Sequence, residues 1–366
     1  MRAALFVFGA WLAAVTVYRW LALRAVEQRI ARGDREPDLV PPDGEVVALR
    51  PLRGAKPWLE ECLESLWRAA APTRTRVVLG VAERDDPARW VVQKAMAHAE
   101  RPPTELRIAP GPPGRNRKVA NLIQMTEGLR AEILLFSDAD VRVPGDYVDR
   151  AIAPFKQTDV GLVTFPYRSV PGRSLASRLD ALVTNTHFLP GVAMALGLQG
   201  LHFALGASIA VRREALERAG GLEALLDVSG DDYWMGRNIE NAGYRLAFVP
   251  VMLDHVVEDS GWRSAASRHL RWSRVVREQR PLGYLGQALT HGAPPALAVG
   301  ALAAASGAGA LGALVPLAWW ALQAAGLWRR RQILGLRASD LVLLPVVDAC
   351  AFLIWAGGLF GRPRPS

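Results

Sequence analysis

Strand and helix patterns alternate through the first third of the chain, and this alternation restricts the fold more than any other feature. Short apolar runs typical of buried strands are separated by segments in which apolar residues recur at helical spacing. The expected strands are 46–49, 76–82, 106–109 and 133–136, and the expected helices are 58–70, about 87–99 and about 118–129. Strands joined through helices of ten or more residues pair in parallel by right-handed crossovers. The sequence therefore predicts an α/β fold, doubly wound around a mostly parallel sheet.

The same pattern continues to about residue 250, with one apolar interruption. The further elements expected are a helix near 146–155, strands at 160–165, 206–212 and 244–250, and a helix beginning at Asp231. The segment 174–203 is long and apolar, but Pro190, Gly191, Gly197 and Gly200 interrupt it too often for an ordinary spanning helix. It could lie at a membrane interface or form buried core, and the sequence leaves both interpretations open.

The N-terminal end of the chain has the character of a membrane span. Residues 3–18 contain no charge, and arginines follow from Arg19 onward. A run of roughly 18 to 20 residues can just cross about 30 Å of hydrocarbon. A signal peptide would carry its charge before the apolar run, and the positive-inside rule places the following residues in the cytoplasm. We expect a transmembrane helix at 1–24 and a linker at 25–44.

The C-terminal end carries a second apolar region, 286–366. Residues 293–327 contain no charge and end before three arginines, Arg329 to Arg331. As one helix this run would exceed about 50 Å, so spans at about 293–309 and 311–328 fit better, followed by one at about 341–360. Asp348 lies inside the last span, where an ionisable side chain is costly and is expected to face other helices or a polar pocket. Residues 45–285 remain as one cytoplasmic domain that includes segment 174–203.

Composition excludes several classes of protein. The formal net charge is +9, from 44 Lys+Arg against 35 Asp+Glu, and many arginines lie beside the apolar ends. That placement favours a membrane surface or anionic substrates, with no nucleic-acid partner. Cys62 and Cys350 are too far apart in sequence to suggest a disulfide framework. The chain also lacks the phosphate-binding loop of nucleotide hydrolases, the dinucleotide-binding glycine pattern, a zinc pattern and a complete nucleophile elbow.

Polar side chains follow the predicted strands at the points where ligands bind in open α/β sheets. Asp138-Ala-Asp140 comes directly after the fourth strand and offers two oxygen ligands to a divalent cation that also binds phosphates. The other groups are Glu83 to Asp86, Asn116 to Asn121, Gly230 to Tyr233, and Arg268, Arg271, Arg274 and Arg277 on one helix. Each has a plain structural alternative: a turn for the Asp pair, a helix cap for Asp231 and Asp232, or a solvated or membrane-facing basic face for the arginines.

Together these groups match the requirements of a transferase that uses a sugar nucleotide. Such an enzyme needs a carboxylate near the nucleoside, two carboxylates for a metal–diphosphate, a base for the acceptor hydroxyl and cations for the departing diphosphate. The set supports that interpretation better than any one member does.

The ordered motifs resemble the ceramide glucosyltransferase family, membrane-bound lipid glycosyltransferases with the glycosyltransferase-A fold. The motifs are Arg50-Pro-Leu-Arg-Gly54, Asp85-Asp-Pro87 with Glu83 before it, Asn116-x-Lys118-x-x-Asn121-Leu, Ser137-Asp-Ala-Asp140-Val-Arg-Val143, Gly206-Ala-Ser208, Asp231-Asp-Tyr233 and Arg268-His-Leu-Arg-Trp272. Two further stretches, Asn185-Thr-His187-Phe-Leu-Pro190 and Arg280-Pro-Leu-Gly-Tyr284, resemble a bacterial branch that includes hopanoid-associated glycosyltransferases. The resemblance covers roughly residues 45–285 and extends to the apolar flanks, which implies one N-terminal and two to three C-terminal transmembrane helices.

The resemblance also implies roles for individual residues. Asp138 and Asp140 would hold Mg²⁺ or Mn²⁺ on the diphosphate of a UDP-sugar, and Asp232 would be the general base. Arg271 and Trp272, with Arg268, would act on the departing diphosphate. The remaining substrate-binding residues implied are Glu83, Asp85, Asn116, Lys118, Asn121, Asp138, Asp231 and His187. Glu83 stands where the family has Asp, so Asp85 is an alternative contact to the nucleoside. For His187 the alternative to substrate binding is a purely structural role.

The function expected from this resemblance is the inverting, metal-dependent transfer of a hexose from a UDP-sugar to a membrane lipid at the bacterial inner membrane. UDP-glucose with a ceramide-like acceptor, and UDP-N-acetylglucosamine with a hopanoid, are the two leading pairs. Diacylglycerol remains a possible acceptor. A processive polysaccharide synthase and a non-catalytic membrane scaffold are the alternatives from other classes.

Overall fold

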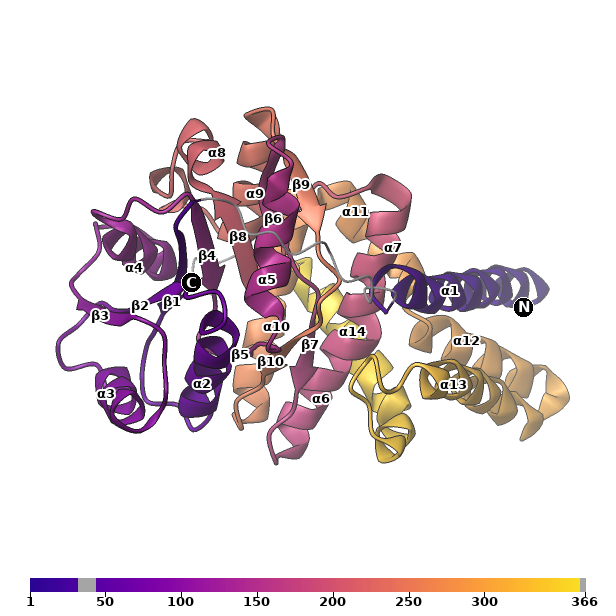
Figure 1. Ribbon diagram of the computed structural model, residues 1–366. Coiled ribbons are helices and arrows are strands. Elements are labelled where there is room, and N and C mark those ends of the chain that lie inside the picture. The colour runs from indigo at the N-terminus through magenta and orange to yellow at the C-terminus, as the bar shows by residue number, and fades with distance from the viewer. Residues whose placement is uncertain (32–43, 363–366) are drawn as a thin grey trace. The chain divides into compact units, whose positions relative to one another are not determined.

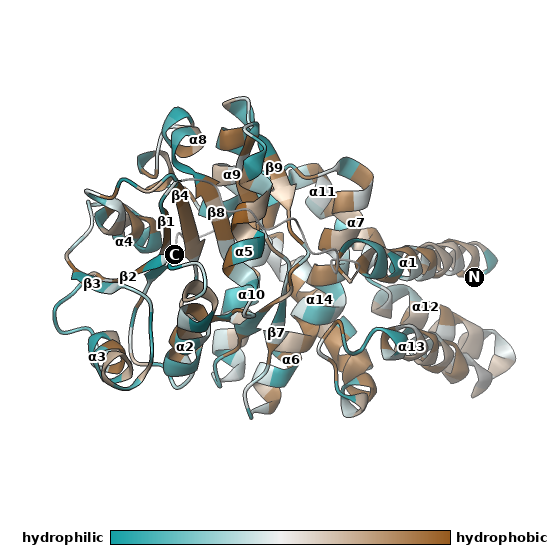
Figure 2. Cartoon of the chain, in the orientation of Figure 1, coloured by the Kyte–Doolittle hydropathy of each residue, from teal (hydrophilic) through white to brown (hydrophobic). Residues whose placement is uncertain are grey.

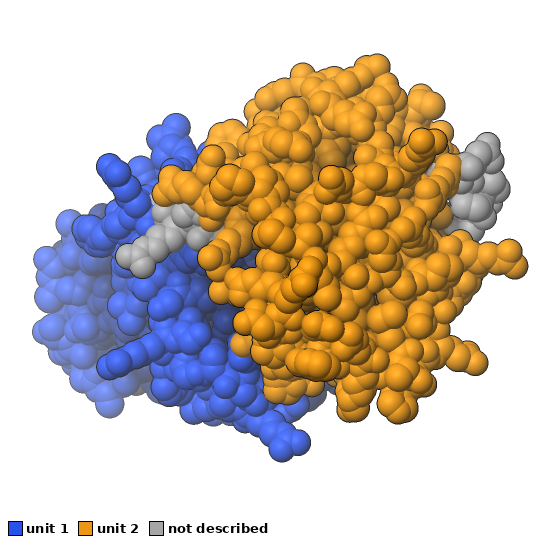
Figure 3. All heavy atoms as spheres, turned by 90° about the vertical axis from the view of Figure 1, so that its left-hand side faces the viewer, with its two compact units in different colours: residues 1–31, 168–198, 257–363 blue, residues 32–167, 199–256, 364–366 orange. Residues whose placement is uncertain are grey.

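The computed structural model describes residues 1–31 and 44–362, which fall into two compact units (Figure 3). The first, here called the sheet unit, comprises described residues within 44–167 and 199–256. The second, the helical unit, comprises residues 1–31, 168–198 and 257–362. Most of the linker predicted at 25–44 lies outside the described residues, and its first residues belong to a helix that continues to Arg29.

A seven-stranded sheet in the order β3-β2-β1-β4-β8-β6-β9 forms the centre of the sheet unit (Figure 1). Its strands are β1 (Val46–Pro51), β2 (Arg76–Val81), β3 (Thr104–Ile108), β4 (Ile133–Ser137), β6 (Val160–Thr164), β8 (Ser208–Arg212) and β9 (Arg245–Phe248). The first four strands pair in parallel, as does β6 with β9. The mostly parallel α/β sheet predicted from the sequence is therefore confirmed, with each predicted strand close to its expected position.

Strand β8 is the exception, because it runs antiparallel to both β4 and β6. The chain leaves the sheet unit after Tyr167 and returns at Gln199. The strand is thus not reached by the short strand–helix crossover that makes neighbouring strands parallel. The sequence pattern gave no sign of this reversal.

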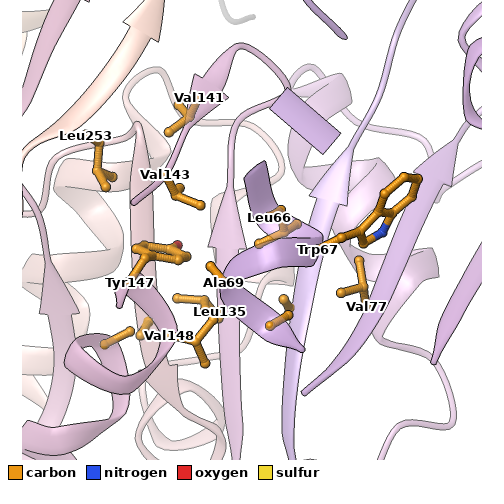
Figure 4. Close-up of a cluster of buried hydrophobic side chains, with 14 of the residues drawn as sticks. Leu66, Trp67, Ala69, Val77, Leu135, Val141, Val143, Tyr147, Val148 and Leu253 are labelled. Atoms are coloured by element: carbon orange, nitrogen blue, oxygen red, sulfur yellow. The ribbon is translucent and has the colours of Figure 1, made fainter. Parts of the chain in front are cut away.

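Helices cover both faces of the sheet and divide the core into two clusters. The helices are α2 (Leu59–Ala70), α3 (Ala88–His98), α4 (Arg117–Thr126), α5 (Tyr147–Ile152), α8 (Arg213–Arg218) and α9 (Asp231–Asn241). One cluster joins α2, α3 and α5 to the sheet through Leu63, Trp67 and Tyr147, part of which Figure 4 shows. The other joins α4 and α9 through Leu122 and Ile239. Figure 2 shows β4 and β8, between these layers, in the brown of hydrophobic residues.

Three short strands were not expected from the sequence. Strand β5 (Val141–Arg142) follows the Asp pair directly and pairs antiparallel with β10 (Leu253–Val256). The third, β7 (Tyr167–Val170), begins at the last residue of its segment of the sheet unit. Strands of two to four residues contain too few alternating positions to give a period-2 signal.

The helical unit contains three helices that are long and apolar enough to cross a membrane, among the described residues. They are Arg2–Arg29, Leu175–Gln199 and Ala338–Gly358, and the pair Pro281–Thr290 and Ala293–Ala308, bent by 41°, could form a fourth span. The unit consists of α1 (Arg2–Arg29), α6 (Leu175–Val183), η2 (Thr184–Phe188), α7 (Leu189–Gln199), α10 (Trp262–Gln279), α11 (Pro281–Gly286), η4 (Gln287–Thr290), α12 (Ala293–Ala303), η5 (Ala304–Ala308), α13 (Leu311–Arg329), η6 (Ala338–Leu343) and α14 (Leu344–Gly358).

The segment from Leu175 to Gln199 is more regular than its sequence suggested. It is helical throughout, although Pro190 and Gly191 lie inside it. A π-helical turn at Thr184–Phe188 ends two residues before this proline, and such turns occur as single turns inside α-helices. The helix ends beside Gly200, which has φ +78°. The expected interruption is therefore absorbed without breaking the helix.

A buried ion pair joins the first and last helices of the helical unit. Arg19 Nη2 donates to Asp348 Oδ1 at 2.6 Å, and the ring nitrogen Nε2 of His187 lies 3.0 Å from the same oxygen. Trp320 Nε1 donates to the other Asp348 oxygen at 2.9 Å. The expectation that Asp348 faces other helices is confirmed. Burying a carboxylate is tolerated when it is paired in this way.

We expect Leu63→Ala to lower the stability of the sheet unit markedly. Leu63 is fully buried in the core cluster of α2, so truncation removes apolar contacts and leaves a cavity. Such substitutions cost about 2–5 kcal/mol in the free energy of unfolding. Thermal unfolding of the purified protein measures the loss. Arg68→Ala, at an exposed position of the same helix, is the control and should change stability little; equal losses in both variants would contradict this packing.

Candidate active site

The Asp138-Ala-Asp140 segment is fixed at the carboxyl end of β4 by backbone hydrogen bonds. The Asp138 N–H donates to the carbonyl of Ala207 at 3.0 Å, just before β8. The carbonyl of Asp140 accepts from the N–H of Val256 at 2.8 Å, at the end of β10. The antiparallel strand β8 and the short strand β10 therefore hold the two carboxylates in place.

Lys118 connects two groups of carboxylates that are far apart in the sequence. Its Nζ lies 2.5 Å from Asp138 Oδ1 and 3.7 Å from Asp231 Oδ2. Asn116 caps α4 by accepting from the N–H of Val119 at 3.1 Å, and its Nδ2 donates to Asp231 Oδ1 at 3.1 Å. The N-terminal ends of α4 and α9 thus meet at one place.

A small pocket opens beside this contact, lined by Lys118, Asp138, Gly206 and Asp231 among others. Helix N-termini carry unpaired backbone N–H groups and partial positive charge, so they attract anions such as phosphates. The pocket therefore combines donors for an anion with carboxylates for a cation. The predicted residues Asn116, Lys118, Asp138 and Asp231 lie together here.

The negative charge of this cluster exceeds its positive charge, so the cluster attracts a further proton or cation. Burial and the neighbouring Asp231 raise the pKa of Asp232 to about 6. Burial also raises the pKa of Asp138, more than Lys118 lowers it. For Lys118, burial alone would lower the pKa, but the carboxylates of Asp138 and Asp231 outweigh burial and raise it. Lys118 therefore stays charged and neutralises only part of the carboxylate charge.

Asp140 has a different environment because of His255 in β10. Burial alone would raise the pKa of Asp140, but the His255 ring, 3.4 Å away at its Nε2, holds it below the ordinary value. Tyr167 packs edge-on against that ring, with centroids 5.9 Å apart. Burial and the carboxylates of Asp232, Asp138 and Asp140 raise the pKa of the Tyr167 hydroxyl, which stays protonated.

His255 and Tyr167 are site residues that the sequence reasoning missed. Each belongs to a short strand, β10 or β7, that the apolar period did not reveal. The available signal was position, because Tyr167 comes three residues after the end of β6.

A second cation lies buried near the Asp pair. Arg50 is fully buried; its Nε donates to Ser137 Oγ at 3.1 Å and its Nη1 to the carbonyl of Cys62 at 2.6 Å. Burial lowers the pKa of Arg50, which the carboxylates of Asp138 and Asp140 partly offset. This gives the first residue of the Arg50-Pro-Leu-Arg-Gly54 motif a structural and electrostatic role near β4.

The other predicted site residues of the sheet unit lie in varied surroundings. Asn121 is buried, and its Nδ2 donates to the carbonyl of Gly80 at 3.0 Å, which fixes the end of β2. Glu83 and Asp85 are exposed directly after β2. The neighbouring Asp86 is the anchored member of that group, accepting from the N–H groups of Gly54 and Ala88 at 2.8 Å each.

The remaining predicted residues belong to the helical unit, and their roles stay predictions. Arg268, Arg271 and Trp272 lie on α10, and His187 lies in the π-helical turn η2. Inside that unit His187 takes part in the buried network with Arg19 and Asp348. That network supports the structural role that was its alternative.

The donor set at the end of β4 fits a divalent cation with few protein ligands. Among the described residues no cluster of three or more His, Cys, Asp or Glu side chains could enclose a metal ion. Asp138 and Asp140 supply carboxylate oxygens, and the ammonium of Lys118 already forms an ion pair with Asp138. Ions such as Mg²⁺ bind through one or two carboxylates plus substrate phosphates and waters. The residues present fit that mode rather than a closed metal cage.

Comparison with known proteins gives a family match over nearly the whole chain. The model of the family described as Glycosyl transferase family 21 matches residues 7–363. Among solved structures, the mannosyltransferase PcManGT from Pyrobaculum calidifontis, in complex with GDP-Man and Mn²⁺, has a TM-score of 0.52 at 20% identity, covering 96% of this chain and 99% of that chain. At that identity the likeness shows the fold alone, which is glycosyltransferase-A-like.

A second solved structure is similar over part of the chain. The glucosyl-3-phosphoglycerate synthase from Mycobacterium tuberculosis, in complex with Mn²⁺, UDP and phosphoglyceric acid, has a TM-score of 0.42 at 13% identity, covering 64% of this chain and 78% of that chain. A similarity this low supports no argument about the site.

We expect Lys118→Met to destabilise the metal-free protein at pH 8 by about 1–3 kcal/mol, because half-buried carboxylates lose the cation paired with them. The raised pKa values of Asp138 and Asp232 mean that the folded state binds protons more tightly than the unfolded state, so stability falls as pH rises through them. Protonated carboxylates carry no charge that a cation must balance. The stability lost in Lys118→Met should therefore shrink below about pH 6. Thermal unfolding in EDTA at pH 8 and pH 5.5 measures both values.

The matched control is Lys94→Met, which removes an exposed lysine paired with Glu60 at 3.4 Å. An exposed pair contributes about 0–1 kcal/mol, so this variant should change stability little at either pH. A deficit in Lys118→Met of the same size at both pH values would contradict the charge balance described here.

Proposed function

Because the chain belongs to glycosyl transferase family 21, we propose that it transfers a hexose from a UDP-sugar to the hydroxyl of a membrane lipid, with inversion at the anomeric carbon. Membership of that family makes the chain a glycosyltransferase, as its resemblance to the ceramide glucosyltransferases predicted. The donor, the acceptor and the roles of single residues are the proposal. The observation that carries it is the meeting of Lys118, Asp138, Asp231 and Asp232 at the carboxyl ends of the sheet strands.

The donor diphosphate fits the place where α4 and α9 begin. The Lys118 ammonium and the N-terminal N–H groups of α4 would bind its oxygens. Asp138 and Asp140 would hold Mg²⁺ or Mn²⁺, which neutralises diphosphate charge when bound. The Mn²⁺ and GDP-Man named for the mannosyltransferase from Pyrobaculum calidifontis support this assignment for a protein of the same fold. Asn116 orients Asp231, and Glu83 or Asp85 would contact the nucleoside beyond β2.

Asp232 is the proposed general base. An ordinary Asp, with a pKa of about 3.9, is a weak base at neutral pH. Its pKa of about 6 here makes Asp232 a stronger base that is still mostly ionised at pH 7. The carboxylate would take the proton of the lipid hydroxyl as that oxygen attacks the anomeric carbon. The UDP leaving group departs as this bond forms, with its charge stabilised by Arg271 and Trp272 and, as a further cation, Arg268.

Asp232 is also held tightly enough for this role. A Cβ added at Gly206 would lie 2.9 Å from Asp232 Oδ2, so the carboxylate packs closely against that glycine. The Tyr233 N–H donates to it at the start of α9. Close packing and a backbone donor restrict its rotamers, and precise positioning of a base contributes to the rate.

The apolar helices support a membrane acceptor. The three helices able to span a membrane, or four with the bent pair, all belong to the helical unit among the described residues. We place the protein in the bacterial inner membrane with the sheet unit on the cytoplasmic side, where UDP-sugars are available. A processive polysaccharide synthase usually needs more spans to form a channel. A scaffold would have no need for a half-buried cluster of carboxylates around one lysine.

A transfer assay tests the proposal directly. The purified protein in lipid nanodiscs is given Mn²⁺ with UDP-glucose or UDP-N-acetylglucosamine, and ceramide, a hopanoid polyol or diacylglycerol. We expect UDP release with one donor to depend on a lipid that has a free hydroxyl, and to stop in EDTA. Mass spectrometry of the product then identifies the sugar and the lipid. Growth of a sugar polymer without lipid would point to a synthase, and no UDP binding at all would favour a scaffold.

Asp232→Asn should lower kcat by about 10²–10⁴-fold, the usual contribution of general-base catalysis, while UDP affinity stays close to that of the unmodified protein. In the unmodified protein, kcat/KM should fall about tenfold per pH unit below pH 6, because only the ionised Asp232 carboxylate accepts a proton. Steady-state kinetics and UDP titration measure these values.

Asp227→Asn is the matched control for Asp232→Asn. Asp227 is exposed, lies a few residues before Asp232 and accepts from the Arg115 N–H at 3.0 Å. Its amide replacement keeps an acceptor oxygen, so kcat should change little. Normal turnover in Asp232→Asn would assign the base role to another residue.

A further inference from the structure

A buried carboxylate on α6 binds two consecutive residues of α10, the helix that carries the Arg268-His-Leu-Arg-Trp272 motif. Asp180 lies on α6, and its side chain is only 1% exposed. Its Oδ1 accepts from His269 Nε2 at 2.7 Å, and its Oδ2 pairs with Arg268 Nη2. All three residues belong to the helical unit. Asp180 belongs to none of the motifs that pointed to the transferase.

The geometry of this contact fixes both the distance and the rotation of α10. Successive side chains on an α-helix point about 100° apart. A carboxylate that binds both Arg268 and His269 therefore loses at least one partner if α10 turns about its axis. A buried carboxylate left without a partner is strongly unfavourable, so Asp180 opposes such a rotation.

His269 passes this constraint on to Trp272. The two rings lie edge to face, with centroids 5.3 Å apart and planes at 84°, an arrangement that aromatic pairs prefer. The two residues are one turn apart on α10, so the ring of His269, fixed by Asp180, supports the ring of Trp272. Asp180 therefore holds Trp272, one of the side chains proposed to act on the leaving group, through His269.

Helix α14 also packs against α10 and holds a second part of its surface. Arg277 Nη1 donates to the carbonyl of Gly358 at 2.7 Å. A Cβ added at Gly358 would lie 2.2 Å from Ser273 Oγ, so the two helices approach closely there. The contacts with Asp180 and with α14 therefore both oppose a rotation of α10.

We propose that Asp180 is a positioning residue for sugar transfer. It holds α10 in the rotation at which Arg271 and Trp272 stabilise the departing diphosphate. This inference rests on the proposed function, because the roles of Arg271 and Trp272 come from it. Asp180 itself touches no reacting atom and acts through Arg268 and His269.

The test is Asp180→Asn in the full-length protein in nanodiscs. The amide keeps the shape of the side chain and an oxygen for His269, but its NH₂ group opposes the N–H donors of Arg268. We expect kcat for transfer to fall about 10–100-fold, as for a misplacement of about 1 Å in an active site. KM for the UDP-sugar should stay within about threefold, because the leaving-group contact acts mainly in the transition state.

A double variant separates positioning from a merely structural role. If Asp180 acts through Trp272, adding Asp180→Asn to Trp272→Ala should lower kcat much less than it does alone. Full additivity of the two losses would overturn the inference. His269→Gln is the second variant, for the case that Asp180→Asn folds poorly. It keeps an N–H donor for Asp180 but removes the ring beside Trp272, so kcat should fall while the melting temperature changes little; unchanged kcat in this variant would overturn the inference.

Asp340→Asn is the matched control. Asp340 is also buried, and it pairs with Arg178 on the same helix α6 and accepts from the Arg337 N–H at 2.6 Å. The substitution removes a comparable ion pair from α6 without touching Arg268 or His269, and kcat should remain near that of the unmodified protein. Equal losses of kcat in Asp180→Asn and Asp340→Asn would overturn the inference. Full activity of Trp272→Ala and Arg271→Ala would instead reject the leaving-group roles in the proposed function.

Discussion

The ammonium of Lys118 is the contact on which the arrangement of the site depends. It joins Asp138, at the end of β4, to Asp231, at the start of α9, and so links residues separated by 93 positions. Without a cation these carboxylates would repel one another in a partly buried space. The lysine neutralises only part of their charge. The negative charge that remains, together with burial, raises the pKa of Asp138 and of Asp232. This excess negative charge would attract a metal–diphosphate, and it makes the Asp232 carboxylate more basic than an ordinary one.

The helical unit solves the problem of buried charge in a similar way. Asp348 takes Arg19 and Trp320 as partners, and Asp180 takes Arg268 and His269. In each case one carboxylate collects donors from other helices, which satisfies its oxygens and fixes how those helices are rotated. Apolar contacts between helices are less directional, so the ionic contacts fix the rotation of each helix more precisely.

How well the sequence predicted each element depended on the strength of its local pattern. Strands β1, β2 and β4 and helices α2 and α4 were found because several apolar positions repeat at one period. The Asp pair and Lys118 were found because they follow strands or begin helices. Strands β5, β7 and β10 were missed because they are too short to show a period, and with them Tyr167 and His255. The continuity of α6 to α7 was misjudged because Pro190 breaks most helices but not one that has a π-helical turn before it.

The sequence by itself determined the α/β class, the apolar ends, the family resemblance and the identity of the candidate side chains, because periodicity and motif order are properties of neighbouring residues. Only the tertiary structure decided the antiparallel insertion of β8, the pairing of Lys118 with Asp138 and Asp231, and the grip of Asp180 on α10. Those features depend on which distant segments meet and on how far water is excluded where they do. The chemistry available at Asp232 is an example: the sequence supplies a carboxylate, and burial beside Asp231 shifts its pKa toward neutrality.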